Sequence, residues 1–326
     1  MVFPGMSIRA SFLLLLASLS LPWMVAEEPP RKPVAAVERF EPVDSTRDRT
    51  VPVKVYLPAS KSPQPVVIFS HGLGGSRENG VYLGEHWAAA GYVAVFVQHP
   101  GSDESVWKNA GRGERLTAMR AAASLRSTLD RYADIPFVLD QLELWNAGAD
   151  HPLKGRLDLE HIGMCGHSFG AVTTQGMMGQ RFLADRSFGD PRLDAFFPMS
   201  PSGSRGISSE KAFGHIEAPV LCMTGTEDTS IITPELTAAS RREVYASLPA
   251  GDKYQLVFEG GQHSAFSDGA LFNEKQFEHH HGAIQQISTR FWDAYLRGDA
   301  AAKAWLQSER PRSDCQLLAK DVWEWK

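Results

Sequence analysis

Hydrophobic residues fall into short continuous runs, and stretches with helical spacing separate several of them. The runs with strand character are VPVKVYLP (51–58), PVVIFSHG (65–72), YVAVFVQHP (92–100), LEHIGMCG (159–166), DAFFPMSP (194–201), PVLCMTG (219–225) and YQLVFEG (254–260). Most of them are apolar on both faces, which is typical of parallel strands covered by helices on either side of a sheet. The pattern predicts an α/β fold with a doubly wound, mainly parallel sheet.

Helical spacing is clearest at 76–91, 134–146, 171–182 and 282–299. The alternation of strands and helices predicts one domain over residues 37–312, followed by a C-terminal tail at 313–326. The connection MSPSGSRGISSEKAFGHIEA (199–218) is too short to form a full cap domain over the sheet. We therefore expect an uncapped domain with a fairly open site.

The first 26 residues have the layout of a secretory signal peptide. Arg9 gives a basic start, an apolar stretch covers 12–21, and Ala26 supplies a small residue for cleavage. The apolar stretch is shorter than the roughly 20 residues of a membrane span. The pattern predicts a signal peptide at 1–26, a flexible lead-in at 27–36 and a secreted or periplasmic protein without an integral membrane segment. Retention of the segment as a membrane anchor is the alternative.

Charge and cysteine content narrow the classes of partner. The chain has 33 Lys and Arg against 38 Asp and Glu, a net charge of −5, which gives no indication of a nucleic acid or an anionic membrane as partner. Of three cysteines, Cys165 and Cys222 lie in strand-like runs and read as small buried hydrophobes, while the pairing of Cys315 stays open. No metal-ligand spacing is present, so we expect no bound metal. We also expect a monomer.

The segment GHSFG (166–170) places Ser168 between two glycines directly after a strand-like run. A plain Gly-rich turn is one interpretation. Because a strand precedes and a helix follows, the context favours a nucleophile elbow, a tight turn that exposes a strained serine at a helix N-terminus. Ser168 is therefore the candidate nucleophile.

A serine hydroxyl needs a base, and functional groups in such sheets gather at the carboxyl ends of strands. The next strand ends are TEDTS, which offers Glu227 and Asp228, and GGQHSAF, which offers His263. The order Ser, Asp, His predicts His263 as the base and Asp228 as the acid, with Glu227 as the strongest competitor. Asp194 starts its strand, and Asp268 follows the histidine too closely.

Other histidines need no catalytic role. His71, His99 and His167 are candidates to line the mouth of the site. The run at 279–281 invites a metal interpretation, but adjacent side chains on a helix point in different directions, so we expect it to be solvated surface.

A Gly-rich loop, FSHGLGGS (69–76), follows the second strand-like run. Its glycines let the backbone approach a substrate. The backbone N–H groups of Leu73 and Phe169 are therefore the candidate donors of an oxyanion hole. The loop HPGSDESVWKNAG (99–111) is expected to wall the site, and Trp107 is a candidate substrate contact, with surface packing as the alternative.

The segments FSHGLGG, GHSFG, TGTED and GGQHSAF together resemble the secreted dienelactone-hydrolase-like α/β-hydrolases. That group is similar in turn to platelet-activating-factor acetylhydrolases and cutinase-like polyesterases. The resemblance implies carboxylic ester hydrolysis by a Ser168, His263 and Asp228 triad through an acyl-serine intermediate, with no cofactor.

Three positions differ from these groups. Ser168 stands where dienelactone hydrolases have cysteine, FFPMSPSGS lacks the carboxylate that plasma-type acetylhydrolases carry there, and Ser202 occupies the place of a substrate-stacking aromatic in polyesterases. Ser202 is thus a second candidate substrate contact. The hypothesis is a serine esterase; the alternatives are a lipase or phospholipase, a cutinase-like polyesterase, and a non-catalytic binding protein on a hydrolase scaffold.

Overall fold

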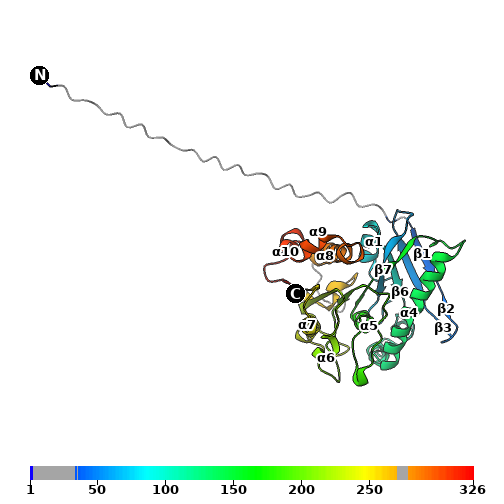
Figure 1. Cartoon of the computed structure of the whole chain (residues 1–326). Coiled ribbons are helices and arrows are strands. Elements are labelled where there is room, and N and C mark those ends of the chain that lie inside the picture. Colours follow the sequence, from blue (N-terminus) through cyan, green and yellow to red (C-terminus); the bar gives the residue numbers. More distant parts are fainter. Residues whose placement is uncertain (3–33, 35, 270–277) are drawn as a thin grey trace. The chain divides into compact units, whose positions relative to one another are not determined.

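A mainly parallel sheet forms the centre of the fold, in the order β1-β4-β6-β5-β7-β8-β9-β10-β11 (Figure 1). The computed structural model describes residues 1–2, 34, 36–269 and 278–326, so nearly all of the predicted signal peptide and lead-in lies outside the described residues. The strands are β1 (Ala36–Phe40), β4 (Val53–Leu57), β5 (Gln64–Ser70), β6 (Val93–Val97), β7 (Leu157–His167), β8 (Ala195–Met199), β9 (Val220–Glu227), β10 (Lys253–Gln262) and β11 (Val322–Trp325), with a separate hairpin of β2 (Val43–Asp44) and β3 (Arg49–Thr50).

The central strands β6, β5, β7, β8, β9 and β10 pair in parallel, while β1, β4 and β11 pair antiparallel at the two edges. The parallel strands are the runs that the sequence shows as apolar on both faces, and β6 is buried along its whole length. Burial on both faces requires helices on both sides. The predicted doubly wound α/β fold is therefore confirmed.

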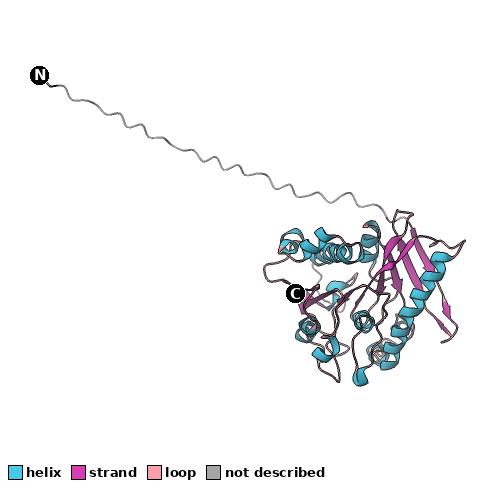
Figure 2. Ribbon diagram, in the orientation of Figure 1, coloured by secondary structure: helices cyan, strands magenta, loops and turns pink. Residues whose placement is uncertain are grey.

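Helices cover both faces of this sheet (Figure 2). They are α1 (Val81–Ala89), α2 (Ser105–Lys108), α3 (Arg115–Ala122), α4 (Leu125–Ala147), α5 (Phe169–Met177), α6 (Ser209–Phe213), α7 (Ala238–Ser247), α8 (Glu278–Leu296), α9 (Ala300–Leu306) and α10 (Arg310–Asp314), with short 3-10 turns at Leu183–Asp185 and His263–Phe266. Within the described ranges, every helix is too short or too polar to cross a bilayer.

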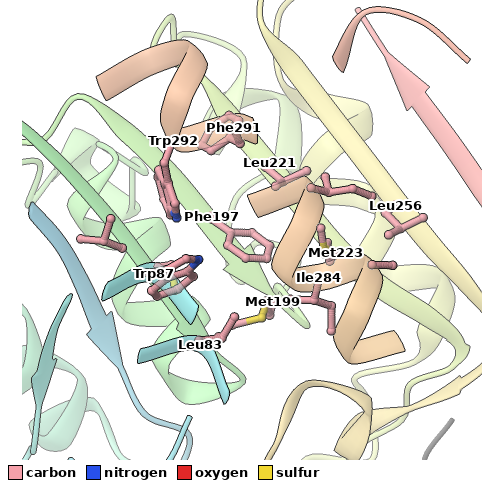
Figure 3. Packing of buried hydrophobic residues seen from close by; sticks show 14 of the residues in the cluster. Leu83, Trp87, Phe197, Met199, Leu221, Met223, Leu256, Ile284, Phe291 and Trp292 are labelled. Carbon is pink, nitrogen blue, oxygen red and sulfur yellow. The ribbon is translucent and has the colours of Figure 1, made fainter. Parts of the chain in front are cut away.

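One apolar core lies between the sheet and the helices α1 and α8. Figure 3 shows Trp87 from α1 and Trp292 from α8 close to Phe197 of β8. The two indoles meet edge to face with their centroids 6.0 Å apart, a favourable aromatic geometry. Because both indoles are fully buried, this pair fixes α1 and α8 against the sheet.

A second core lies on the opposite face, beneath α4 and α7. Ile135, Val138 and Leu139 of α4 pack in one cluster with Val66 and Ile68 of β5. Ser124 begins α4 as its N-cap, because its hydroxyl accepts a hydrogen bond from the N–H of Ser127. The helix is thus fixed at its start by a cap and along its length by burial.

Residues 313–326, expected to form a tail, contribute a strand to the sheet. Val322–Trp325 pairs antiparallel with β10, and the backbone of Lys326 exchanges two hydrogen bonds with that of Lys253. The domain therefore continues past residue 312. Four residues are too few for a periodic signal, and only the partner strand determines their conformation.

Cys165 and Cys222 are fully buried and unbridged. The thiol of Cys315 is also buried, and its sulfur lies 3.8 Å from Oε1 of Gln286. The two strand cysteines thus pack as small hydrophobic side chains.

Candidate active site

The turn between β7 and α5 holds Ser168 in an unusual backbone conformation. Its φ is 57° and its ψ is −112°, a region that costs a non-glycine residue on the order of 1–3 kcal/mol. A Cβ at Gly170 would lie 1.8 Å from the carbonyl oxygen of Ser70, and one at Gly166 would lie 2.4 Å from that of Gly170. Only glycine fits at these two positions. The sequence GHSFG therefore allows the close strand–helix packing that presents Ser168.

Three side chains at the carboxyl edge of the sheet form a continuous chain of hydrogen bonds. Oγ of Ser168 lies 2.9 Å from Nε2 of His263, and Nδ1 of His263 lies 2.7 Å from Oδ1 of Asp228. Ser168 follows β7, Asp228 follows β9 and His263 follows β10. Because these strands run parallel, their carboxyl ends meet at one edge and bring together residues distant in sequence.

The carboxylate of Asp228 is fully buried and has several polar partners. Besides His263, Thr224 Oγ1 donates to Oδ2 at 2.9 Å, and Nε of Arg241 lies 2.9 Å from Oδ1. Burial acts to raise the pKa of Asp228, but the hydrogen bond to His263 and the charges of His263 and Arg241 lower it to about 2. Asp228 is therefore an ionised partner for the imidazole at neutral pH.

The other carboxylates considered for this role lie elsewhere. Glu227 is exposed and accepts a hydrogen bond from Nε2 of Gln262 at 3.1 Å. Asp194 accepts from the N–H of Ile162 near the start of β8, and Asp268 accepts from the N–H of Gly80. Because these three carboxylates bind other groups, Asp228 is the carboxylate that contacts His263.

The oxyanion loop, residues 70–75, lies directly beside the serine. A Cβ added at Gly72 would lie 3.5 Å from Cβ of Ser168, so a side chain at this position would contact the serine. Leu73 follows in this loop, and Phe169 begins α5. The N-terminus of α5 favours negative charge through its unpaired N–H groups and its dipole. The role of Leu73 and Phe169 as oxyanion-hole donors stays a prediction.

The two candidate substrate contacts are both half-buried. The indole N–H of Trp107 donates to the carbonyl of Gly74 at 2.7 Å, so this side chain is fixed against the oxyanion loop. The backbone of Ser202 exchanges two hydrogen bonds with the side-chain amide of Gln175 on α5. Contact of either residue with a substrate stays a prediction.

The histidines expected at the mouth of the site lie in the interior. His71 and His99 are essentially unexposed and belong to a buried polar network, and His167 is buried with its ring centroid 4.7 Å from that of His263. The sequence showed that these histidines follow strand ends, but it did not show how deeply they are buried. Burial, together with the charge of His263, lowers the pKa of His167 well below its usual value.

The histidine run at 279–281 lies in the first turn of α8, and the expectation of a solvated surface was wrong, because His280 is buried and the other two are half-buried. His280 is buried with its ring centroid 4.2 Å from that of Phe258, and His281 stacks on Tyr82 at 3.9 Å. Aromatic packing against neighbouring elements outweighs hydration of these rings. In the part of the chain that the structure describes, no three His, Cys, Asp or Glu side chains come together as a metal-binding group.

Arg241 is a site residue that the sequence does not reveal. It comes from α7, is 1% exposed, and its Nη1 donates to the carbonyls of Ser200 and Pro201 after β8. Its Nη2 lies 3.3 Å from Nδ1 of His263. An arginine in a polar amphipathic helix has the sequence signature of a surface residue, so only tertiary structure identifies this role.

Known proteins similar to this chain are esterases and an acetylhydrolase family. The family model of platelet-activating factor acetylhydrolase, isoform II, matches residues 47–110. Cutinase 2 of Thermobifida cellulosilytica is 24% identical over 212 residues, 65% of this chain and 64% of that protein. A cutinase of Thermobifida fusca is also 24% identical over 212 residues, which cover 53% of its length.

The chain thus spans less than two thirds of the length of these curated relatives. Among solved structures, a ferulic acid esterase from Streptomyces cinnamoneus superposes with a TM-score of 0.59 at 19% identity, covering 84% of this chain and 93% of that one. The tight turn at Ser168, the order of the strands in the sheet and this superposition all indicate the same fold. The chain thus has the α/β-hydrolase fold and is similar in sequence to cutinases.

Proposed function

We propose that the protein is a serine hydrolase of carboxylic esters in which Ser168, His263 and Asp228 form the catalytic triad. The hydrogen-bonded chain from Ser168 Oγ through the imidazole of His263 to Asp228 carries the proposal. This geometry supplies a nucleophile, a base and a group that orients the base. Similarity to cutinases supports esters as the substrate class.

In the proposed mechanism, Nε2 of His263 takes the proton from Ser168 as Oγ attacks the ester carbonyl. Asp228 holds Nδ1 of the ring and stabilises the imidazolium that forms. The N–H groups of Leu73 and Phe169 bind the tetrahedral oxyanion. His263 then protonates the leaving alcohol, and water hydrolyses the acyl-serine by the reverse sequence of proton transfers.

A fluorophosphonate probe tests the nucleophile directly. The protein should be labelled on Ser168, and Ser168→Ala should abolish both labelling and turnover of p-nitrophenyl esters. Ser62→Ala, in an exposed loop, is the matched control and should be labelled like the unmodified protein. Equal labelling of Ser168→Ala would refute the assignment. A protein that turns over no ester in a chain-length series would instead favour a non-catalytic binding protein.

A second candidate function, hydrolysis of lipid assemblies or polyesters, is favoured by exposed apolar side chains beside the oxyanion loop. Met119 of α3 reaches Gly74, and Arg120 Nη2 donates to the carbonyl of Ile231 in the loop after Asp228. Leu116 of α3, Leu125 at the start of α4, and Ile231 are 42%, 74% and 47% exposed. Exposed apolar side chains are suited to contact an apolar surface.

The two functions differ in their response to substrate assembly. An interfacial enzyme should show a rate increase when a p-nitrophenyl ester passes from monomers to micelles, and Leu125→Ser should reduce that increase. Leu144→Ser is a control, because Leu144 is 64% exposed at the far end of α4, comparable to Leu125. A rate that follows monomer concentration alone would favour a soluble ester as the substrate.

We further propose that the protein is exported and that cleavage after Ala26 leaves Glu27 as the first residue. Intact-mass measurement of protein from the extracellular or periplasmic fraction tests this. A mass that includes residues 1–26 would favour retention as an anchor.

A further inference from the structure

We propose that His71 is a positioning residue that aims the N–H of Leu73 at the oxyanion, an inference that rests on the proposed function. His71 is the last residue before the glycines of the oxyanion loop and is buried. Its side chain touches no candidate triad residue in the described contacts. Its effect would pass through the peptide group between Gly72 and Leu73.

The imidazole of His71 holds that peptide group by its carbonyl. Nδ1 lies 2.6 Å from the carbonyl oxygen of Gly72, while Nε2 accepts a hydrogen bond from the backbone N–H of His99 at 3.1 Å. Since Nε2 is the acceptor, Nδ1 carries the proton and donates to Gly72. The N–H of Gly75 donates to the same oxygen at 3.1 Å, so two donors fix the direction of this carbonyl.

A carbonyl fixed in this way also fixes the next N–H. The C=O of Gly72 and the N–H of Leu73 belong to one planar trans peptide and point in opposite directions. With the oxygen bound to the buried imidazole, the N–H points away from it. Within the described residues, the N–H of Leu73 makes no backbone hydrogen bond, so it is available to a ligand.

The surroundings of His71 keep it neutral, as the donor role requires. Burial first, and then the charge of Arg131, lower its pKa well below the usual value. Nη2 of Arg131 lies 3.4 Å from Nδ1, and Nη1 donates to the carbonyl of His71 at 2.8 Å. The Arg131 guanidinium also lies 4.3 Å from the ring centroid of Phe169. One buried cation therefore contacts both His71 and the side chain of Phe169.

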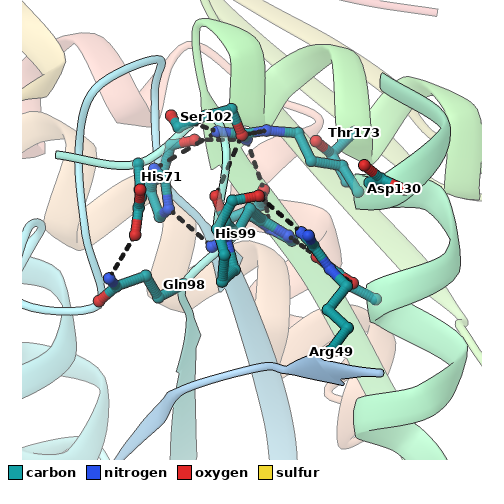
Figure 4. A network of polar contacts seen from close by, with 12 residues as sticks. Arg49, His71, Gln98, His99, Ser102, Asp130 and Thr173 are labelled. Carbon is teal, nitrogen blue, oxygen red and sulfur yellow. Dashed lines mark hydrogen bonds and ion pairs between the residues drawn. The ribbon is translucent and has the colours of Figure 1, made fainter. Parts of the chain in front are cut away.

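A second chain of polar contacts anchors the partner of His71 (Figure 4). His99 is bonded through Nδ1 to Oδ2 of Asp134 and through Nε2 to Oγ of Ser70, each at 2.9 Å. Arg49 in turn binds both carboxylate oxygens of Asp134. Ser70, His99 and Asp134 are completely buried, so this serine cannot meet a substrate. The network acts as a rigid support that holds the His99 N–H against Nε2 of His71.

Two amide substitutions separate the two contacts of His71. An asparagine places its Nδ2 near the position of the imidazole Nδ1 and can still donate to Gly72. A glutamine reaches the position of Nε2 and can only replace the contact with His99. If His71 only stabilised the fold, asparagine would preserve activity no better than glutamine. If His71 aims the N–H of Leu73, activity depends on the donor to Gly72, which only asparagine keeps.

The test compares kcat and KM for p-nitrophenyl acetate, and the inhibition constant of phenylboronic acid, whose tetrahedral adduct occupies the oxyanion hole. We expect His71→Gln to lower kcat by about 10- to 100-fold, to leave KM within about threefold, and to weaken the boronate in parallel. His71→Asn should keep kcat within about fivefold of the unmodified enzyme. Melting temperatures of both variants verify that each one is folded under the assay conditions.

Equal losses in the two variants, or an unchanged kcat in His71→Gln, would overturn the inference. If His71→Gln does not fold, the folded His71→Asn variant alone tests the inference. A large loss of kcat in His71→Asn would contradict the role of the Nδ1 donor, and a retained kcat would support it. An unmodified protein without esterase activity defeats the proposed function instead. The two failures are thus distinguishable.

Discussion

Arg241 and Asp228 form a buried ion pair, with Nε of the guanidinium 2.9 Å from Oδ1 of the carboxylate and neither side chain more than 1% exposed. The same guanidinium binds the carbonyls of Ser200 and Pro201, so it joins the end of β8 to the loop after β9. Removal of one partner from such a pair leaves a buried charge uncompensated.

Arg241→Met should therefore lower the free energy of unfolding by about 3 kcal/mol and reduce kcat by releasing Asp228 from its fixed position. Denaturant unfolding and ester kinetics measure the two effects. Arg242→Met is the control, because the neighbouring Arg242 makes an exposed 3.6 Å pair with Glu324 that contributes about 0.5 kcal/mol. Similar losses in both variants would contradict a specific role for Arg241.

Asp228→Asn should lower kcat by about 10³- to 10⁴-fold, because a neutral amide neither orients the imidazole correctly nor stabilises its charged form. Glu227→Gln, at the adjacent position, should change kcat by less than about threefold, since its carboxylate is exposed and bonded to Gln262. Steady-state kinetics on both variants check this prediction. A larger loss in Glu227→Gln would reassign the acid.

Acid should destabilise the protein through its buried histidines. Burial, followed by the charge of Arg131, lowers the pKa of His99 to about 4, against about 6.5 in the unfolded chain. Between these values the unfolded state binds the additional proton, so the unfolding free energy is highest above pH 6.5 and falls as the pH drops toward 4. From pH 7.5 to 5, His99 alone should account for about 2 kcal/mol.

Urea unfolding at these two pH values measures this loss. In His99→Gln the difference between the two pH values should shrink by a comparable amount, although the variant is less stable at both. His71 and His167 act in the same direction, because their pKa values are also lowered by burial. An equal pH dependence in the variant and the unmodified protein would exclude His99 as a source.

Gly170→Ala should prevent formation of the elbow, because the added methyl would lie 1.8 Å from the backbone oxygen of Ser70. We expect a large loss of soluble folded protein, measured by circular dichroism and thermal melting. Gly282→Ala, where a Cβ meets nothing within 4 Å inside α8, should instead raise stability by about 0.5–1 kcal/mol. A stable, active Gly170→Ala would contradict the packing at the elbow.

Sequence reasoning located the features that depend on neighbouring residues. The apolar runs predicted the parallel strands, and GHSFG indicated the tight turn because strand, glycines and helix stand next to one another. The positions of Asp228 and His263 followed from a general property of parallel sheets, that strand ends meet at one edge.

Features that depend on distant contacts could not be predicted in the same way. Arg241 contacts Asp228 only because α7 packs beside β9. His71 and His99 were expected at the mouth, but Arg131 and Asp134 from α4 bury and bind them. The sequence gives the order of these residues along the chain, but it does not give the burial of their side chains.

The final strand β11 protects the backbone of the strand that leads to His263. By pairing with β10, it covers N–H and C=O groups that would otherwise form an open edge next to an apolar core. Loss of residues 322–326 would expose this edge for strand addition by other molecules. Self-association into β-rich aggregates, rather than simple unfolding, is therefore the expected failure of such a truncation, and the imidazole would lose its support with it.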